Sequence, residues 1–268
     1  MIHVRLCPLS RREFEKDVYR PGVISLSRLT WGSLGGGLTL GIIALLSKAC
    51  DVGVLYPPLA ATCFINATCV YLRVARPRQV IVGHLVSTVA GLLAVFGVDA
   101  LLRWLPQGSG PPFKLGLAVA LAAVFMQVFD ADHPPAAATA AIPAILPLPA
   151  DTWVLPLHMA WGSVIAVLCA LAWNRVWFAF PAPECDGAPM CFGLHQGRME
   201  TLGLGVCVLG AVFMGLRPVS HILYAAGLWI MLAGGLTLMT QHFPGARIIF
   251  RDARTRSLAS GKTGLPGS

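Results

Sequence analysis

A short proline-containing phrase occurs twice in this chain. Residues 56–62 read Tyr-Pro-Pro-Leu-Ala-Ala-Thr, and residues 133–139, which lie 77 positions later, read His-Pro-Pro-Ala-Ala-Ala-Thr. Proline is tolerated in the first turn of a helix, where its missing N–H would have no partner, and it ends any helix that precedes it. Each copy therefore predicts a break in the chain, with a new helix that begins at the Pro-Pro pair.

Both copies lie in strongly apolar stretches. Only 12% of the residues are charged, against about 25% in a typical soluble domain. Eight windows carry no charged residue, and most of them reach the roughly 17–25 apolar residues that a spanning helix needs. We therefore expect an all-α membrane protein with about eight transmembrane segments, in a lipid bilayer. The windows are 29–47, 52–72, 79–98, 115–129, 133–150, 152–174, 201–216 and 218–246.

The charged residues predict an orientation. A formal net charge of +8 would suggest a nucleic-acid partner for a soluble protein, but in a membrane protein it reflects the positive-inside rule. If the N-terminus is cytoplasmic and every segment crosses, only Lys48, Arg103, Lys114 and Arg217 of the 20 Lys and Arg fall outside. We therefore expect both termini in the cytoplasm, a bacterial inner or plasma membrane, and no nucleic-acid partner.

The repeated phrase also predicts an internal repeat. Residues 25–101 and 114–175 each hold three segments, namely a helix, a short or broken helix and a helix. Three crossings reverse the direction of the chain, so the two units form an inverted 3+3 repeat, an architecture common among transporters. The expected divisions are a cytoplasmic segment 1–24, a transmembrane core 25–178, a cytoplasmic loop 179–200, two additional helices within 201–241 and a basic cytoplasmic tail 242–268.

The starts of the two short helices are candidate anion sites. A helix N-terminus has free N–H groups and the positive end of the helix dipole, and two inverted starts could share one anion near the midplane. The alternative is that Pro-Pro only shapes packing and that the threonines bond back to carbonyls. The candidate substrate-binding residues of the two phrases are Tyr56, Pro57, Pro58, Thr62, His133, Pro134, Pro135, Ala136 and Thr139.

Ionisable residues suggest a proton relay. His84, within the third segment, is a further candidate for substrate binding, and it could donate to an anion, carry a proton or simply pack. Fifteen uncharged residues separate Lys114 from Asp130, roughly 22 Å of helix against a hydrocarbon core about 30 Å thick. Asp130, Asp132 and His133 are therefore expected within the membrane, where they could relay protons.

These residues leave more than one function open. A channel or transporter for a small monovalent anion such as nitrite is the main hypothesis. An aquaporin-like pore for a neutral solute is the first alternative, and a metal-binding or enzymatic membrane protein that uses Asp130, Asp132 and His133 is the second. The sequence has no nucleotide-binding loop, nucleophile elbow or zincin motif, so we expect no enzyme, no metal and no cofactor. Arg78 is interpreted as a topology signal that could also attract anions, and homo-oligomerisation stays open.

One set of motifs resembles a known family. Its residues are Arg76-Pro77-Arg78-Gln79, Gly83-His84, His133-Pro134-Pro135, Ala137, Ala138 and Thr139. On these residues the chain resembles, over 25–178, the HPP family of integral membrane proteins, some of whose plant and cyanobacterial members are implicated in nitrite transport. Gln79 stands where the family has Asn, and Ala137 replaces a motif glycine. The resemblance implies a small-anion permease.

Overall fold

The computed structural model describes residues 28–69, 72–101, 110–146, 152–177, 190–191, 194–195 and 197–241. The predicted N-terminal segment 1–24 and basic tail 242–268 lie outside these ranges, as does most of the predicted loop 179–200. Within them the α-helices are α2 (Ser33–Cys50), α3 (Tyr56–Thr68), α4 (Pro77–Leu101), α5 (Gly110–Val128), α6 (Pro134–Ile145), α7 (Leu155–Trp177), α8 (Arg198–Gly215) and α9 (His221–Thr240).

Short elements complete the described chain. A π-helical turn, η1 (Arg28–Gly32), precedes α2, and 3₁₀ turns η2 (Arg73–Ala75) and η4 (Thr152–Val154) precede α4 and α7. Strands β1 (Met190–Cys191) and β2 (Leu194–His195) pair antiparallel before α8. These strands, which the sequence did not predict, lie in the segment between the two predicted groups of membrane helices.

The eight predicted segments correspond to six long helices and two short ones. The six long helices are long and apolar enough to cross a membrane. The short helices α3 and α6 have 13 and 12 residues, which gives about 20 and 18 Å of helix against a core of about 30 Å. Both begin at the repeated phrase, as predicted, because the residues before them, Leu55 and His133, are extended and the prolines fill the first turn.

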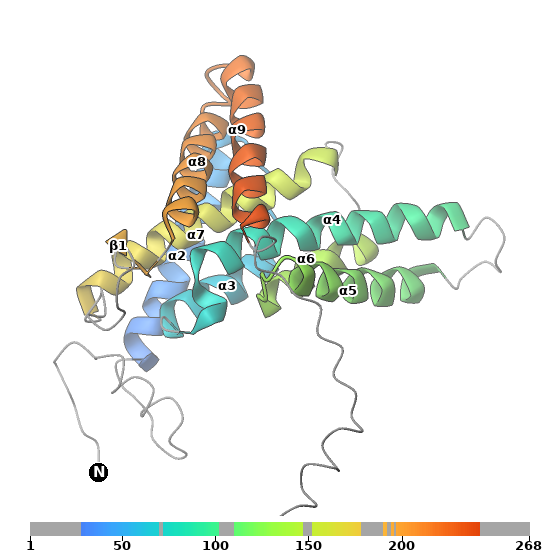
Figure 1. The fold of residues 1–268 in the computed structure, drawn as a ribbon, viewed down its shortest axis with the longest axis horizontal. Coiled ribbons are helices and arrows are strands. Elements are labelled where there is room, and N and C mark those ends of the chain that lie inside the picture. The colour runs from blue at the N-terminus through green and yellow to red at the C-terminus, as the bar shows by residue number, and fades with distance from the viewer. Residues whose placement is uncertain are drawn as a thin grey trace, which may run out of the picture.

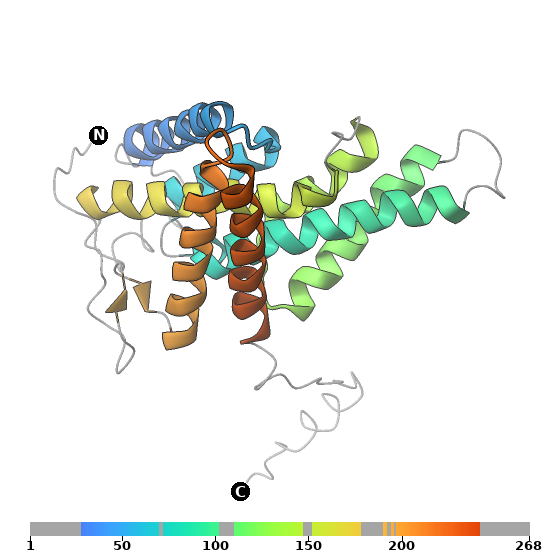
Figure 2. The same ribbon diagram turned by 90° about the horizontal axis from the view of Figure 1, so that it is seen from above.

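The helices α4 and α7 form the centre of the fold. They cross the middle of the molecule in Figures 1 and 2, and the short helices α3 and α6 pack beside them. Most residues of α4 and α7 are buried, whereas about a third or fewer of the residues in α2, α5, α8 and α9 are buried, although these helices are apolar. Side chains such as Ile222 and Trp229, which are 81% and 72% exposed, suit contact with lipid rather than water. The fold is that of an integral membrane protein.

Glycines let the short helices approach the central ones. A Cβ atom on Gly83 of α4 would lie only 2.9 Å from the His133 Cβ and 3.1 Å from the Ala131 carbonyl oxygen. Eight residues further along the same helix, a Cβ on Gly91 would collide with the backbone of Ala140. Small residues at such contacts allow helix backbones to come close in membrane proteins. The two glycines therefore fix α6 against α4.

The α8–α9 hairpin packs across this core. Its two helices lie side by side and run across the direction of α4 and α7 in both views (Figures 1 and 2). The Trp161 indole N–H of α7 donates to the Ala211 carbonyl of α8 over 3.0 Å. At the other end of the hairpin, the Arg78 Nε–H of α4 donates to the Leu238 carbonyl of α9, also over 3.0 Å. Polar side chains of the core thus hold the hairpin in place.

Candidate functional site

Four of the predicted site residues meet in one buried cluster. The Thr62 hydroxyl oxygen of α3 lies 2.7 Å from Nε2 of His84 and 2.9 Å from Nε2 of His133. The other ring nitrogen of His84, Nδ1, lies 2.8 Å from the Thr139 hydroxyl of α6. All four side chains are 0% exposed, and the two rings meet edge to face with centroids 5.3 Å apart. His84 of α4 therefore joins the two short helices through their matching threonines.

A backbone carbonyl fixes the direction of these hydrogen bonds. His133 Nδ1 lies 2.7 Å from the Val74 carbonyl oxygen, which can only accept, so Nδ1 carries a proton. In neutral His133, Nε2 then accepts from the Thr62 hydroxyl. Thr62 accepts from the Nε2–H of His84, whose Nδ1 accepts from the Thr139 hydroxyl. The result is one directed chain from Thr139 to Val74, with the histidine tautomers assigned from the network.

Thr62 has a second acceptor within reach. Its hydroxyl lies 3.1 Å from the Pro58 carbonyl oxygen, one turn earlier in α3. This is the back-bond that the packing alternative describes. Because a hydroxyl has a single proton, Thr62 can donate to His133 or to Pro58 but not to both. Thr62 is therefore the point at which the chain can change its direction.

The remaining residues of the two phrases lie around this cluster. Pro58 and Pro135 are buried, while Pro57 and Pro134 are exposed. Ala136 is 0% exposed and lies beside Gly83 of α4. Tyr56 is 40% exposed, and its hydroxyl donates to Ser47 Oγ of α2 over 3.0 Å. The prolines and Ala136 thus shape the backbone, and Tyr56 contacts α2 rather than the histidines.

The first turn of α6 offers few donors to an anion. Pro134 and Pro135 have no N–H, and the Ala136 N–H donates to the His133 carbonyl over 2.8 Å. The hydrogen-bonding groups at this helix start are therefore the His133 ring and the hydroxyls beside it rather than free backbone N–H groups. An anion at this position depends on side chains.

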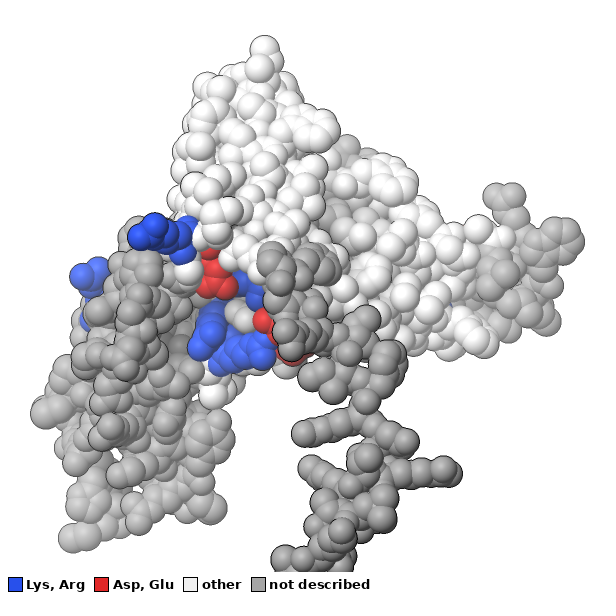
Figure 3. All heavy atoms as spheres, viewed as in Figure 1, with Lys and Arg blue, Asp and Glu red and all other residues white. Residues whose placement is uncertain are grey.

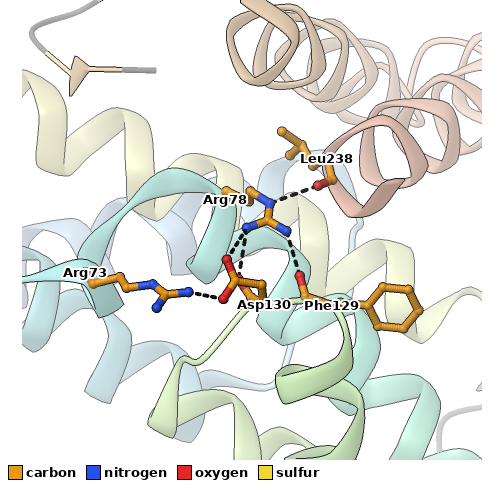
Figure 4. Close-up of polar contacts among 5 residues, drawn as sticks. All are labelled: Arg73, Arg78, Phe129, Asp130 and Leu238. Atoms are coloured by element: carbon orange, nitrogen blue, oxygen red, sulfur yellow. Dashed lines mark hydrogen bonds and ion pairs between the residues drawn. The ribbon is translucent and has the colours of Figure 1, made fainter. Parts of the chain in front are cut away.

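A second polar cluster surrounds Asp130, in the turn between α5 and α6 (Figure 4). Arg78 is 6% exposed, and its guanidinium donates to the Phe129 carbonyl over 2.7 Å and to the Asp130 carbonyl over 2.9 Å. It also pairs with the Asp130 carboxylate over 3.1 Å, and Arg73 pairs with the same carboxylate from the more exposed side. Arg78 thus satisfies the carbonyls that the end of α5 leaves unpaired.

The carboxyl of Asp130 lies beyond the candidate span Pro111–Val128. The helix α5 starts four residues before Lys114, has 19 residues and is about 28 Å long, which is close to the thickness of a hydrocarbon core, and Asp130 follows two residues after its end. Burial alone would raise the pKa of this carboxyl, but the hydrogen bonds and charges of Arg73 and Arg78 outweigh burial, so the pKa is lowered.

The structure does not join the three residues proposed as a proton relay. Asp130 pairs with the two arginines, His133 bonds to Thr62 and Val74, and Asp132 between them is exposed. Among the residues that the structure describes, there is also no group of three side chains suited to a metal ion. The partner of His133 is instead His84, through Thr62.

Sequence reasoning missed the part played by Arg78, which it treated as a topology signal. It also missed a partly buried contact near the start of α3, where the Tyr224 hydroxyl lies 2.7 Å from His158 Nε2. The other nitrogen of His158, Nδ1, lies 3.0 Å from the Gly53 carbonyl oxygen. The available signals were an arginine at the start of one apolar stretch and a histidine inside another, but their partners are far away in the sequence.

The charged side chains are unevenly distributed on the face shown in Figure 3, where blue and red atoms gather below the α8–α9 hairpin and the hairpin itself is white. Other charges lie at the far ends of α4 and α5, where Lys114 pairs with Asp99, and at the turn of the hairpin, where Arg217 pairs with Asp51.

A comparison with protein families agrees with this architecture. Residues 21–181, more than half of the 268 residues, match the model of the family described as HPP, transmembrane region. No curated protein and no solved structure matches the chain. The matched region contains both short helices, His84 and the complete hydrogen-bond chain. The chain belongs to the HPP transmembrane family.

Proposed function

We propose that this protein carries a small monovalent anion, such as nitrite, across the membrane along the contact between α3 and α6. The observation that carries the proposal is the buried bridge by which His84 binds the matching threonines of the two short helices. Buried ionisable groups at membrane depth are costly and mark ion pathways, and short helices that meet inside a bundle are a common form of transporter site.

The same proposal includes the inverted repeat of α2–α3–α4 and α5–α6–α7. Thr62 and Thr139 are 77 residues apart, and Gly83 of α4 has a counterpart 79 residues later in Gly162 of α7. Each glycine faces the other unit. Gly83 lies against the start of α6, and a Cβ on Gly162 would lie 2.7 Å from Leu59 of α3. If a twofold axis relates the units, the third helix of each unit is expected to contact the short helix of the other in this way.

The turns before the short helices support the repeat as well. Asp51 follows α2 and Asp130 follows α5, and these two are the non-glycine residues with positive φ in the described chain, at 53° and 51°. Each carboxylate pairs with arginine, Asp51 with Arg217 and Asp130 with Arg73 and Arg78. The first helix of each unit is therefore followed by an Asp in the left-handed conformation, before the short helix with the Pro-Pro pair begins.

A pore for a neutral solute is the second candidate. The specific observation in its favour is the first turn of α6, where the prolines lack N–H groups and the Ala136 N–H is already bonded. A neutral hydrogen-bonding solute would need no positive charge at this point. Protein-dependent uptake of nitrite but not of an uncharged hydrogen-bonding solute such as glycerol supports the anion, and uptake of the uncharged solute supports the pore.

The test is uptake of nitrite by proteoliposomes. His84→Leu removes the bridge, and Thr88→Val is the matched control, since Thr88 bonds only to the His84 carbonyl in the same helix. We expect His84→Leu to lower the rate about tenfold or more, which corresponds to about 1.4 kcal/mol or more in the barrier, while Thr88→Val stays within about twofold. Equal rates in His84→Leu and the unmodified protein would refute the proposed path.

A further inference from the structure

We propose that His133 binds a proton together with the anion, so that one proton travels with each anion. This inference rests on the proposed function and states that anion transport is coupled to proton transport. It follows from the hydrogen-bond chain around Thr62, from the second acceptor of Thr62 and from the charges that surround His133.

In the neutral state the chain has no donor left for an anion. The Thr139 hydroxyl donates to His84, the His84 Nε2–H to Thr62, the Thr62 hydroxyl to His133, and the His133 Nδ1–H to Val74. Each of these O–H and N–H groups is used once. An anion that entered this site would have to break one of these bonds while bringing an uncompensated charge into a buried place, which is costly.

Loading a proton changes this arrangement at one atom. A proton taken from water binds Nε2 of His133, and the new N–H then donates to the Thr62 oxygen. The Thr62 hydroxyl must now turn away from His133, and its acceptor is the Pro58 carbonyl at 3.1 Å. That contact is longer than the 2.9 Å contact it replaces. Loading therefore adds one donor to the site, and an anion can recruit the Thr62 hydroxyl by replacing its longer contact with Pro58.

The surrounding charges disfavour a loaded site without an anion. His84 of α4 faces His133 with ring centroids 5.3 Å apart, and the adjacent turn places two arginines, Arg73 and Arg78, against the single carboxylate of Asp130. Asp132 is exposed, and α3 and α6 contain no Lys, Arg, Asp, Glu or His. Of these charged side chains Arg78 is buried and the two carboxylates are not, so no buried carboxylate among them compensates an imidazolium at His133, and it needs a bound anion.

The first measurement is the protonation of the two histidines. Full-length protein with ¹⁵N-labelled histidine, in lipid bilayers without nitrite, should show neutral rings, with His133 protonated at Nδ1 and His84 at Nε2. Saturating nitrite should convert His133, assigned with a His133→Gln sample, to the doubly protonated form. Thr62→Val should abolish the conversion, because no hydroxyl remains to redirect. A neutral His133 with nitrite bound, or a cationic one without it, would overturn the proposal.

The second measurement is coupled flux. In proteoliposomes with no membrane potential, a pH difference of one unit should accumulate nitrite about tenfold, the ratio for one proton per anion, after subtraction of the nitrous acid that crosses protein-free vesicles. Thr139→Val acts at the far end of the chain, so it should lower the rate and keep this ratio. Nitrite flux without accumulation overturns the coupling and leaves the proposed function standing, whereas absence of flux overturns both.

Discussion

Replacing Arg78 by Met removes a buried cation that connects three helices. Its guanidinium bonds to the Phe129 and Asp130 carbonyls at the end of α5, to the Asp130 carboxylate and to the Leu238 carbonyl of α9. Methionine is apolar and would remove the donor to the three carbonyls, while the Asp130 carboxylate would keep Arg73 as its partner. Each buried carbonyl that loses its donor costs about 1–3 kcal/mol, so we expect the free energy of unfolding of Arg78→Met to fall by about 3–5 kcal/mol.

Arg73→Met is the matched control, because Arg73 pairs with the same carboxylate but is 52% exposed. An exposed ion pair contributes about 0–1 kcal/mol, so Arg73→Met should be nearly neutral. In thermal unfolding of the purified protein in detergent, Arg78→Met should lower Tm by roughly 6–20 °C, taking about 2–4 °C per kcal/mol. Adding Asp130→Asn to Arg78→Met should recover part of the loss, because the carboxylate that has lost one of its two arginine partners is then neutral. Equal Tm values for the two single arginine variants would refute this account.

Three further predictions follow from the packing, the charges and the proposed topology. Gly83→Ala should lower the free energy of unfolding by about 1–3 kcal/mol and reduce flux, because the added Cβ has no room. Gly97→Ala, on the open side of α4, should instead raise stability by up to about 1 kcal/mol. Thermal unfolding and uptake assays check both variants. Because the pKa of Asp130 is lowered, its contribution to stability is present above the ordinary carboxyl pKa of about 4 and is lost as the pH falls toward the lowered value. Tm measured from pH 6 to pH 3 should therefore fall, and Asp130→Asn should flatten that fall. Single cysteines at Arg76 and Lys114 in a cysteine-free background should be labelled from opposite sides of the membrane, and labelling from one side only would contradict the inverted repeat.

Local chemistry explains which parts of the fold could be predicted. The starts of α3 and α6 follow from the Pro-Pro pairs, because proline restricts both its own backbone and that of the preceding residue. The membrane class follows from apolar length alone. The local sequence also identifies the candidate site residues, because each of them is a polar residue inside an apolar stretch, namely Thr62, His84, His133 and Thr139.

Contacts between distant segments explain what could not be predicted. Arg78 and Asp130 are 52 residues apart, and His158 and Tyr224 are 66 apart, so nothing in the local sequence connects them. The relay through Asp130 was a reasonable hypothesis because Asp130 and His133 are close in the sequence. After the left-handed turn at Asp130 the two side chains have different partners, since Asp130 pairs with arginines and His133 bonds to Thr62 and Val74. These partners depend on the positions of α3, α4 and η2, which the local sequence does not reveal.

The two histidines make the site asymmetric, because the threonines correspond to each other in the proposed repeat and the histidines do not. In the proposed repeat, Gly83 and Gly162 correspond, so the position of His84 is occupied in the second unit by Ser163, which is buried and donates to the Ala160 carbonyl of its own helix. His133 likewise corresponds to Tyr56, whose hydroxyl bonds to Ser47. The hydrogen-bond chain runs from Thr139 toward Val74 and has no counterpart related by the proposed twofold axis. Val74 lies in η2 beside the exposed Arg73, so the chain ends next to an arginine. A symmetric pair of helix starts would bind an anion equally from either side. In the proposed mechanism the repeated threonines form the binding site, and the histidines, which the repeat does not duplicate, link the anion to a proton.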